Sequence, residues 1–98
     1  MITVETGDPV VNKIFRQAGA VDILLFLMDN NNAIQKELVH KLSMNNITVI
    51  RATYQLMDCG LIVTSKGQFN STVYKITDKG KQVGVLFKQI TDLLLIQT

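Results

Sequence analysis

The stretch QKELVHKLSMNNITVIRATYQLMDCG, residues 35–60, decides which fold this sequence predicts. Apolar residues recur at helical spacing over about 35–42 and again over about 46–58, so we expect a helix in each segment. The polar break over 43–46 supplies asparagines, which are favoured N-caps. Gly60 ends the second helix, as a left-handed residue after its last turn. Two helices separated by a short turn predict a helix-turn-helix.

The helix expected over 46–58 has two contrasting faces, and either Asn45 or Asn46 can cap its start. The face that we expect to pack inward carries Val49, Ala52, Thr53 and Leu56. The opposite face, with Gln55 at its edge, carries Ile47, Ile50, Arg51, Tyr54 and Asp58. Two isoleucines are unusual on a wholly solvated face. They suit contact with thymine methyl groups or, equally, with a protein partner.

A hairpin and a long helix follow. Residues 61–65 and 72–76 are rich in β-branched side chains and predict two strands, joined by a tip over 66–71. Thr77 then caps a last helix that extends to about Ile96. The apolar stripe of this helix consists of Val83, Leu86, Phe87, Ile90, Leu93 and Leu94. Because a chain this small can hardly bury the whole stripe, we predict a homodimer that uses these residues.

Two further helices are expected near the start of the chain. The first covers about 9–17, with Asp8 as its N-cap, and Gly19 interrupts the pattern. The second covers about 20–28 and is apolar over most of its circumference, so we expect it at the centre of the core. Residues 29–32 form a cluster of Asp and Asn that predicts a turn.

Length and composition exclude several classes of protein. The chain has 98 residues, 47% of them apolar, and a net charge of +2, which fits one small folded domain. Its apolar runs are too short for a membrane helix and no export signal is evident, so we expect no membrane partner and a cytoplasmic location. One cysteine and one histidine cannot build a disulfide framework or a multi-cysteine metal site. We therefore expect no enzyme, no catalytic residue, no cofactor and no metal, with His40 at the surface and Cys59 as a small packed side chain rather than a redox switch.

Charge is spread unevenly along the chain. Residues 33–77 hold five Lys or Arg against two Asp or Glu, whereas residues 1–32 carry a surplus of negative charge. The middle of the chain is therefore best suited to face an anion. Lys66 and Lys75 either contact phosphates or are solvated lysines, and we favour the contacts. Phe69 either shelters against the domain, inserts at a groove or marks a mobile contact, and we expect shelter.

Four short motifs occur in order along the chain. They are QKELV with LSM within 35–44, TVIR at 48–51, GLIV at 60–63 and YKITDKG at 74–80. Together they resemble the second helix, the recognition helix and the wing of archaeal and bacterial winged helix-turn-helix transcriptional regulators, the broad group of MarR, PadR and ArsR types. The resemblance implies an α+β, mostly α domain with a two-stranded wing and a long C-terminal dimerisation helix. Its parts would be N-terminal helices over 9–28, the helix-turn-helix over 33–60, the wing over 61–77 and the last helix over 78–96.

Regulators of this group usually act as dimers that bind operator DNA and repress transcription. The resemblance therefore implies a sequence-specific, homodimeric regulator that binds double-stranded DNA. The residues that we expect at the DNA are Asn46, Thr48, Arg51, Tyr54, Gln55, Lys66 and Lys75. Arg51 can pair bidentately with guanine and Gln55 can pair with adenine, while the hydroxyl and amide side chains suit phosphates. A small-molecule effector is compatible with the group, although no residue specifies one.

The sequence departs from the group's pattern at two points. Ile34 stands where many members have a Ser or Thr N-cap, so we expect the helix over 35–42 to start differently or to fray. The helix over 46–58 carries one Arg and no Lys, fewer cations than many DNA-binding helices. The alternative function is a protein-interaction winged helix, for example a subunit of a transcription or replication assembly.

Overall fold

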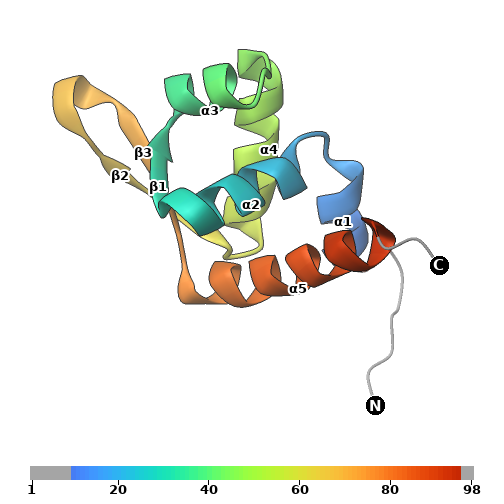
Figure 1. Cartoon of the computed structure of the whole chain (residues 1–98). Helices are drawn as coiled ribbons and strands as arrows, with labels where there is room; N and C mark the ends of the chain where they lie inside the picture. Colours follow the sequence, from blue (N-terminus) through green and yellow to red (C-terminus); the bar gives the residue numbers. More distant parts are fainter. Residues whose placement is uncertain (1–9, 96–98) are drawn as a thin grey trace.

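The computed structural model describes residues 10–95, which form five α-helices and a three-stranded antiparallel sheet (Figure 1). In chain order the elements are α1 (Val10–Arg16), α2 (Ala20–Asn30), β1 (Asn32–Ile34), α3 (Gln35–Lys41), α4 (Asn46–Asp58), β2 (Ile62–Lys66), the short 3-10 turn η1 (Gln68–Asn70), β3 (Thr72–Ile76) and α5 (Asp78–Leu95). The β2–β3 hairpin, here called the wing (residues 62–76), projects from the body on the side away from α1 (Figure 1). The predicted α+β, mostly helical class is confirmed.

Helix boundaries agree closely with the sequence pattern. Helix α4 covers the predicted residues, and α3 ends one residue earlier than predicted. Helix α2 continues two residues beyond the predicted end, so Asn30 is helical instead of lying in a turn. Gly60 has φ of 77° and ends α4 in the predicted left-handed conformation. The predicted cap at Asp8 and the predicted helix end at Ile96 lie outside the described residues.

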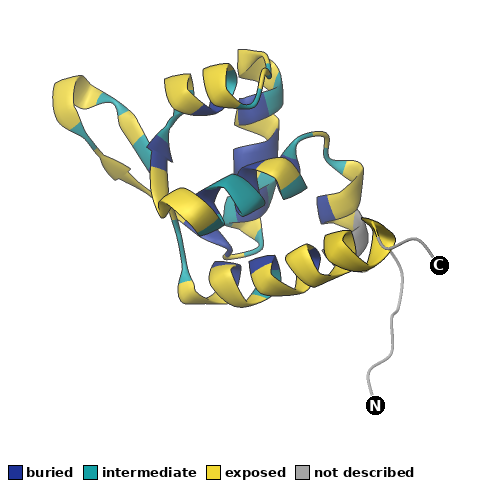
Figure 2. Cartoon of the chain, in the orientation of Figure 1, coloured by how far each residue is buried: buried dark blue, intermediate teal, exposed yellow. Residues whose placement is uncertain are grey.

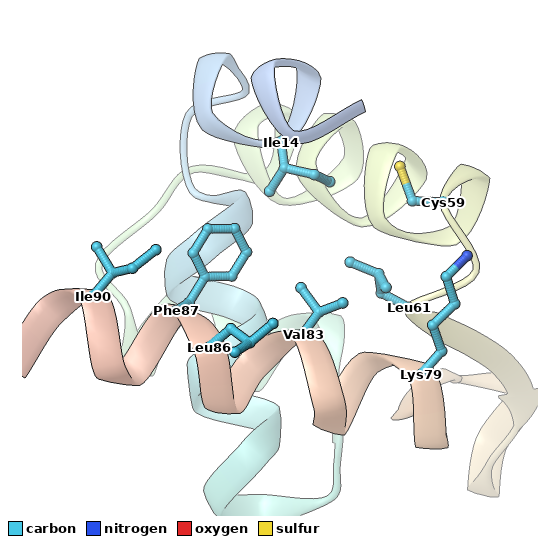
Figure 3. A pocket seen from close by; sticks show the side chains of 8 residues that line it. All are labelled: Ile14, Cys59, Leu61, Lys79, Val83, Leu86, Phe87 and Ile90. Atoms are coloured by element: carbon cyan, nitrogen blue, oxygen red, sulfur yellow. The ribbon is translucent and has the colours of Figure 1, made fainter. Parts of the chain in front are cut away.

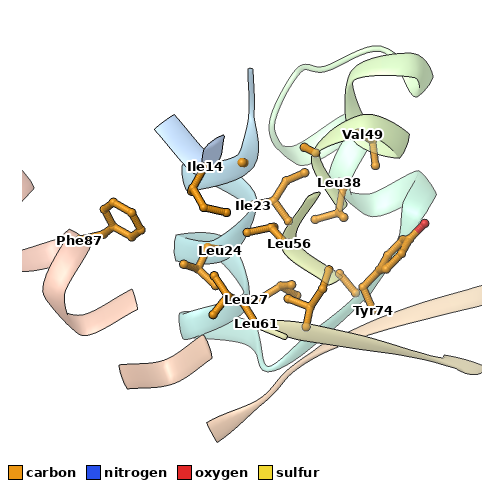
Figure 4. Close-up of a cluster of buried hydrophobic side chains, with 14 residues drawn as sticks. Ile14, Ile23, Leu24, Leu27, Leu38, Val49, Leu56, Leu61, Tyr74 and Phe87 are labelled. Carbon is orange, nitrogen blue, oxygen red and sulfur yellow. The ribbon is translucent and has the colours of Figure 1, made fainter. Parts of the chain in front are cut away.

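The hydrophobic core is centred on α2, as predicted. Ile23, Leu24 and Leu27 of this helix are fully buried. Leu56 of α4 and Tyr74 of β3 lie close to them, and Figure 4 shows the side chains converging between the helices and the sheet. Figure 2 shows the same pattern on the ribbon, with buried positions facing the middle of the domain. Within residues 10–95, no helix meets the length and hydropathy that a membrane span requires.

The predicted two-stranded wing is confirmed, and β1, a strand that the sequence did not predict, adds a third strand to its sheet. The strand order is β1-β3-β2, and β1 pairs with β3 through Asn32–Lys75, Ala33–Tyr74 and Ile34–Val73. Asn32 was predicted in a turn, but it begins this strand. Three residues are too few to show the alternation that marks a strand. The strand forms because a partner far along the chain offers its backbone groups.

Helix α5 lies unusually close to the body at its first turn. A Cβ placed on Gly80 would be only 2.1 Å from the carbonyl oxygen of Leu61. The predicted cap at Thr77 is confirmed, because its Oγ1 accepts a hydrogen bond from the Gly80 N–H at 2.9 Å. The same hydroxyl donates to the carbonyl oxygen of Gly60 at 2.8 Å, which joins the start of α5 to the end of α4.

Candidate nucleic-acid interface

Side chains from both helices of the helix-turn-helix fix the start of α4. Asn45 is the N-cap, and its Oδ1 accepts a hydrogen bond from the Thr48 N–H at 2.7 Å. Asn46 does not cap the helix, and its Oδ1 instead accepts a hydrogen bond from Gln35 Nε2 at 3.0 Å. This second bond joins the first residue of α4 to the first residue of α3. The orientation of α4 is therefore set by a polar contact as well as by the core.

The missing N-cap of α3 does not shift the start of that helix. Ile34 has no side chain that could accept a hydrogen bond, yet α3 begins at Gln35 as predicted. Glu37 Oε1 accepts a hydrogen bond from the Ile34 N–H at 3.0 Å. This reciprocal half of a capping box satisfies one backbone donor. The expectation that the helix would start differently was therefore wrong.

The inner face of α4 anchors the helix in the core. The residues predicted for this face, Val49, Ala52, Thr53 and Leu56, are all at most 1% exposed. The hydroxyl of Thr53 donates to the carbonyl oxygen of Val49 at 2.7 Å, so this buried polar group has a partner. Because one face is held so completely, the opposite face is presented to the surroundings in a fixed orientation.

Within residues 10–95, no segment covers the outer face of α4, as predicted. Ile47, Ile50 and Tyr54 are 61%, 51% and 70% exposed. Arg51 and Asp58 are exposed as well. The spacing of Ile47, Arg51, Tyr54 and Asp58 places them in one row along the helix, with Ile50 beside it.

Two of the residues predicted to contact DNA are less available than the others. Gln55 is half-buried, and its Nε2 approaches the Sγ of Cys59 at 3.8 Å, so the amide points along the helix toward its end. Thr48 is half-buried, and its methyl group lies near Gly19 at the corner between α1 and α2. The predicted α4 contacts that are exposed are Asn46, Arg51 and Tyr54.

The two wing lysines lie on opposite faces of the sheet. Lys66 pairs with Thr72, and Lys75 pairs with Val63. Because side chains alternate along a strand, Lys66 shares the face of Tyr74, whereas Lys75 lies on the other face. Both lysines are exposed. Phosphate contacts by both would therefore need DNA close to the edge or the tip of the wing, not flat against one face.

The prediction that Phe69 shelters against the domain was wrong. Phe69 is 98% exposed and has left-handed backbone angles, φ 55° and ψ 35°. The Gly67 N–H donates to the carbonyl oxygen of Ser71 at 2.8 Å, which closes the turn beneath it. Residue 69 is thus held at the apex of the wing, where the body of the domain is out of reach.

An apolar groove lies between α1, the end of α4 and α5, and the sequence pattern did not indicate it. Its volume is about 340 Å³. Figure 3 shows Ile14 and Phe87 facing each other across it, with Lys79 at one end. The lining residues are Ile14, Cys59, Leu61, Lys79, Val83, Leu86, Phe87 and Ile90. A groove built from three separated segments leaves no local sequence signal.

The residues predicted for dimerisation fall into two groups. Phe87 is buried in the chain itself, and its ring meets that of Phe15 edge-on at a centroid distance of 5.0 Å. Val83 is half-buried against the core. The remaining four are exposed, namely Leu86, Ile90, Leu93 and Leu94. The part of the chain that the structure describes thus covers only the inner edge of the apolar stripe.

His40 and Cys59, the two residues considered for metal or redox chemistry, lie in ordinary surroundings. His40 is exposed on α3, as predicted. Cys59 is half-buried and packs against the core. Among residues 10–95, no three His, Cys, Asp or Glu side chains gather where they could hold a metal ion.

Comparison with known proteins finds similarity in structure but none in sequence. No protein-family model matches the chain. No curated protein matches it either. Among solved structures, 58 chains are similar.

Several of the similar structures are named as transcriptional regulators. A MarR protein from Peptoclostridium difficile DA00132 superposes with a TM-score of 0.76 at 16% identity, over 97% of this chain and 76% of that protein. A SlyA-like transcription regulator from Listeria monocytogenes gives 0.73 at 26% identity, over 86% of this chain and 60% of the other. A mutant of Lactococcus lactis ZitR gives 0.67 at 19% identity over 74% of this chain, which spans about half (50%) of the ZitR protein. The fold is that of MarR-like winged-helix proteins.

Proposed function

We propose that this chain, which has the winged-helix fold of MarR-type transcriptional regulators, is a sequence-specific regulator that binds double-stranded DNA as a homodimer. The observation that carries the proposal is the two-faced character of α4. Its inner face is fully buried, and its outer face presents Arg51 and Tyr54 without any covering segment among residues 10–95. A helix held in this way fits a DNA major groove, which is about 12 Å wide.

The polar residues around α4 suit distinct parts of a duplex. Arg51 lies in the middle of the exposed row, where its guanidinium can pair bidentately with a guanine edge. Tyr54 lies one turn further and can donate its hydroxyl to a phosphate, and Asn46 lies at the helix start near the backbone. Lys66, at the end of β2, would add a phosphate contact from the wing. Lys75 would contact a phosphate only where DNA reaches the other face of the wing. Thr48 and Gln55 are half-buried, so we assign them a smaller part in DNA binding.

A second copy of the chain would cover the exposed side of α5. Leu86 and Ile90 belong both to the exposed stripe and to the lining of the apolar groove, so the two features form one continuous apolar surface. Leu93 and Leu94 extend this surface toward the end of the helix. A contact of this kind between two copies would be twofold symmetric. It would place two α4 helices about one DNA turn apart, as palindromic half-sites require.

Selection of bound duplexes from a random DNA pool tests the proposal. We expect enrichment of a site with twofold symmetry, because a symmetric dimer presents the same α4 surface twice. A pool that shows no enrichment above a protein-free control would contradict sequence-specific binding. An enriched site without symmetry would retain DNA binding but contradict the homodimer.

Replacing Arg51 tests which side chain pairs with a base. Arg51→Ala should weaken binding to the selected site by about 1–3 kcal/mol and relax the preference at one base pair. The matched control is Lys81→Ala, which removes one exposed positive charge from α5 instead. Titration of labelled duplex at fixed salt measures both variants. Equal affinity of Arg51→Ala and wild type would show that another residue makes the base contact.

A protein-interaction winged helix is the second candidate function. The observation that favours it is the exposure of Ile47 and Ile50 beside a single arginine. Capture of partners from the native host, with and without nuclease, separates the two candidates. A partner that persists after nuclease treatment, together with an unenriched DNA pool, would support this second function over the first.

A further inference from the structure

The outer face of α4 is unusually apolar in its first half. Ile47 and Ile50 are more than half exposed, at 61% and 51%. Within residues 10–95, neither belongs to the core or to the partly buried side chains packed around it. In helix-turn-helix proteins, the first residues of the DNA-contacting helix are the ones that meet base edges. The two isoleucines therefore occupy the positions where base contacts are expected.

The chemistry of the major groove restricts what isoleucine can contact there. Phosphates, ring nitrogens and exocyclic amino and carbonyl groups are all polar, and an aliphatic side chain placed against them leaves them without hydrogen-bond partners. The apolar group that base edges present in this groove is the C5-methyl of thymine. Isoleucine at these positions is thus matched to thymine and mismatched to the other base edges.

The surroundings of the two isoleucines favour DNA over an apolar protein partner. Arg51 is the next residue after Ile50 and lies in the same exposed row as Ile47. Residues 33–77, which carry α4 and the wing, hold five Lys or Arg against two Asp or Glu. A polyanion with apolar groups in its groove fits this combination of charge and shape.

We propose that Ile47 and Ile50 contact thymine C5-methyl groups, so that the chain selects its site by methyl contacts next to the guanine that Arg51 pairs with. The inference rests on the proposed function and assigns two specificity-determining residues to it. Three residues rise about 4.5 Å along a helix, close to the spacing of about 3.4 Å between successive bases of one strand. The two side chains therefore meet thymines in adjacent or nearly adjacent base pairs.

Replacing thymine by deoxyuridine in the selected duplex removes the methyl group and keeps every hydrogen bond of the base. We expect affinity to fall about fourfold at each contacted thymine, the effect of withdrawing one buried methyl group. Thymines outside the contacted positions should tolerate the replacement. Affinity that is unchanged at every thymine of the site would overturn the proposal while the selected site itself preserves the proposed function.

Variants of the two isoleucines identify the protein side of the contact. Ile47→Ala and Ile50→Ala should each bind the thymine duplex about four- to tenfold more weakly than wild type. Each should then be insensitive to deoxyuridine at one position, because the methyl group has lost its partner. The matched control is Val85→Ala, an exposed apolar residue of α5, which should behave like wild type on both duplexes.

The outcomes separate this inference from the proposed function. Thermal unfolding of the variants should match wild type, since both side chains are exposed in the folded chain. A variant that instead binds the thymine duplex and the deoxyuridine duplex each more weakly than wild type, by the same factor, would overturn the methyl contact. That result would leave the proposed DNA binding standing. If no duplex is selected at all, both the proposed function and this inference fail.

Discussion

Helices α4 and α5 are both amphipathic, but the chain buries them to very different extents. Helix α4 has 13 residues, and four of them, Val49, Ala52, Thr53 and Leu56, are buried. Helix α5 has 18 residues, and its buried positions are Gly80, Gly84 and Phe87. Most of the large apolar side chains of α5 remain exposed. The shorter helix is thus the better anchored one.

The contrast between α4 and α5 shows that an apolar stripe in the sequence does not reveal which surface packs against it. On α4 the stripe faces α2, with which the helix shares the core. On α5 the closest approach to the body is made by glycines, with Gly84 against Met28 of α2. Small residues bring the backbone close but bury little apolar area, so the leucines on the flank remain uncovered. Contacts within residues 10–95 therefore bury more of α4 than of α5, and the second copy proposed above would cover the leucines of α5.

The largest expected difference is between the loss of a buried leucine from α4 and the loss of an exposed leucine from α5. Leu56→Ala on α4 should lower the free energy of unfolding by about 2–5 kcal/mol, because it opens a cavity in a fully packed site. Leu86→Ala on α5 should change it by less than about 0.5 kcal/mol in protein dilute enough to be monomeric. Urea unfolding followed by circular dichroism measures both. Similar losses for the two variants would refute the contrast between the helices.

An intermediate effect is expected on self-association. Leu93→Glu should raise the dissociation constant of the proposed dimer at least tenfold, because a carboxylate would be placed in an apolar contact. Val85→Glu, which adds the same charge on another side of α5, is the control and should leave association unchanged. Sedimentation equilibrium over a range of concentrations measures the constant. A wild-type chain that stays monomeric throughout that range would remove α5 as a dimer surface.

The smallest expected effects come from the caps of the two helices. Asn45→Ala removes the acceptor for the Thr48 N–H and should cost about 1 kcal/mol. Thr77→Ala should cost more, up to about 2 kcal/mol, because its hydroxyl also donates to the Gly60 carbonyl oxygen. Thermal or urea unfolding gives both values. Asn45→Asp and Thr77→Ser keep the acceptors and should stay near wild type, and a loss as large as in the alanine variants would argue against capping.

Much of the fold could be predicted because the signals are local. The limits of α4, an asparagine cap at residue 45 or 46, the cap at Thr77 and the left-handed Gly60 all follow from local chemistry within one turn of the helix, and the structure selects Asn45. Strand β1 could not be predicted in the same way. Its three residues carry no periodic pattern, and its partner β3 follows only after α3, α4 and β2.

The candidate interface was predicted in part. The division of α4 into a buried and an exposed face follows from helical spacing, and the structure confirms it. The exposure of Phe69 and the half-buried state of Gln55 were not evident, because both depend on how far the body of the domain lies from each side chain. The DNA contacts and the dimer contacts stay predictions until the experiments above are done.

The sequence by itself determined, to within two residues, where α2, α3 and α4 begin and end and which side of α4 is buried, since these depend on groups a few residues apart. The tertiary structure alone decided that β1 joins the sheet, that Lys66 and Lys75 lie on opposite faces and that α1, the end of α4 and α5 form an apolar groove together. Each of these features depends on segments far apart in the chain being brought together. No local sequence pattern indicates these contacts, because they form only when the core around α2 is packed.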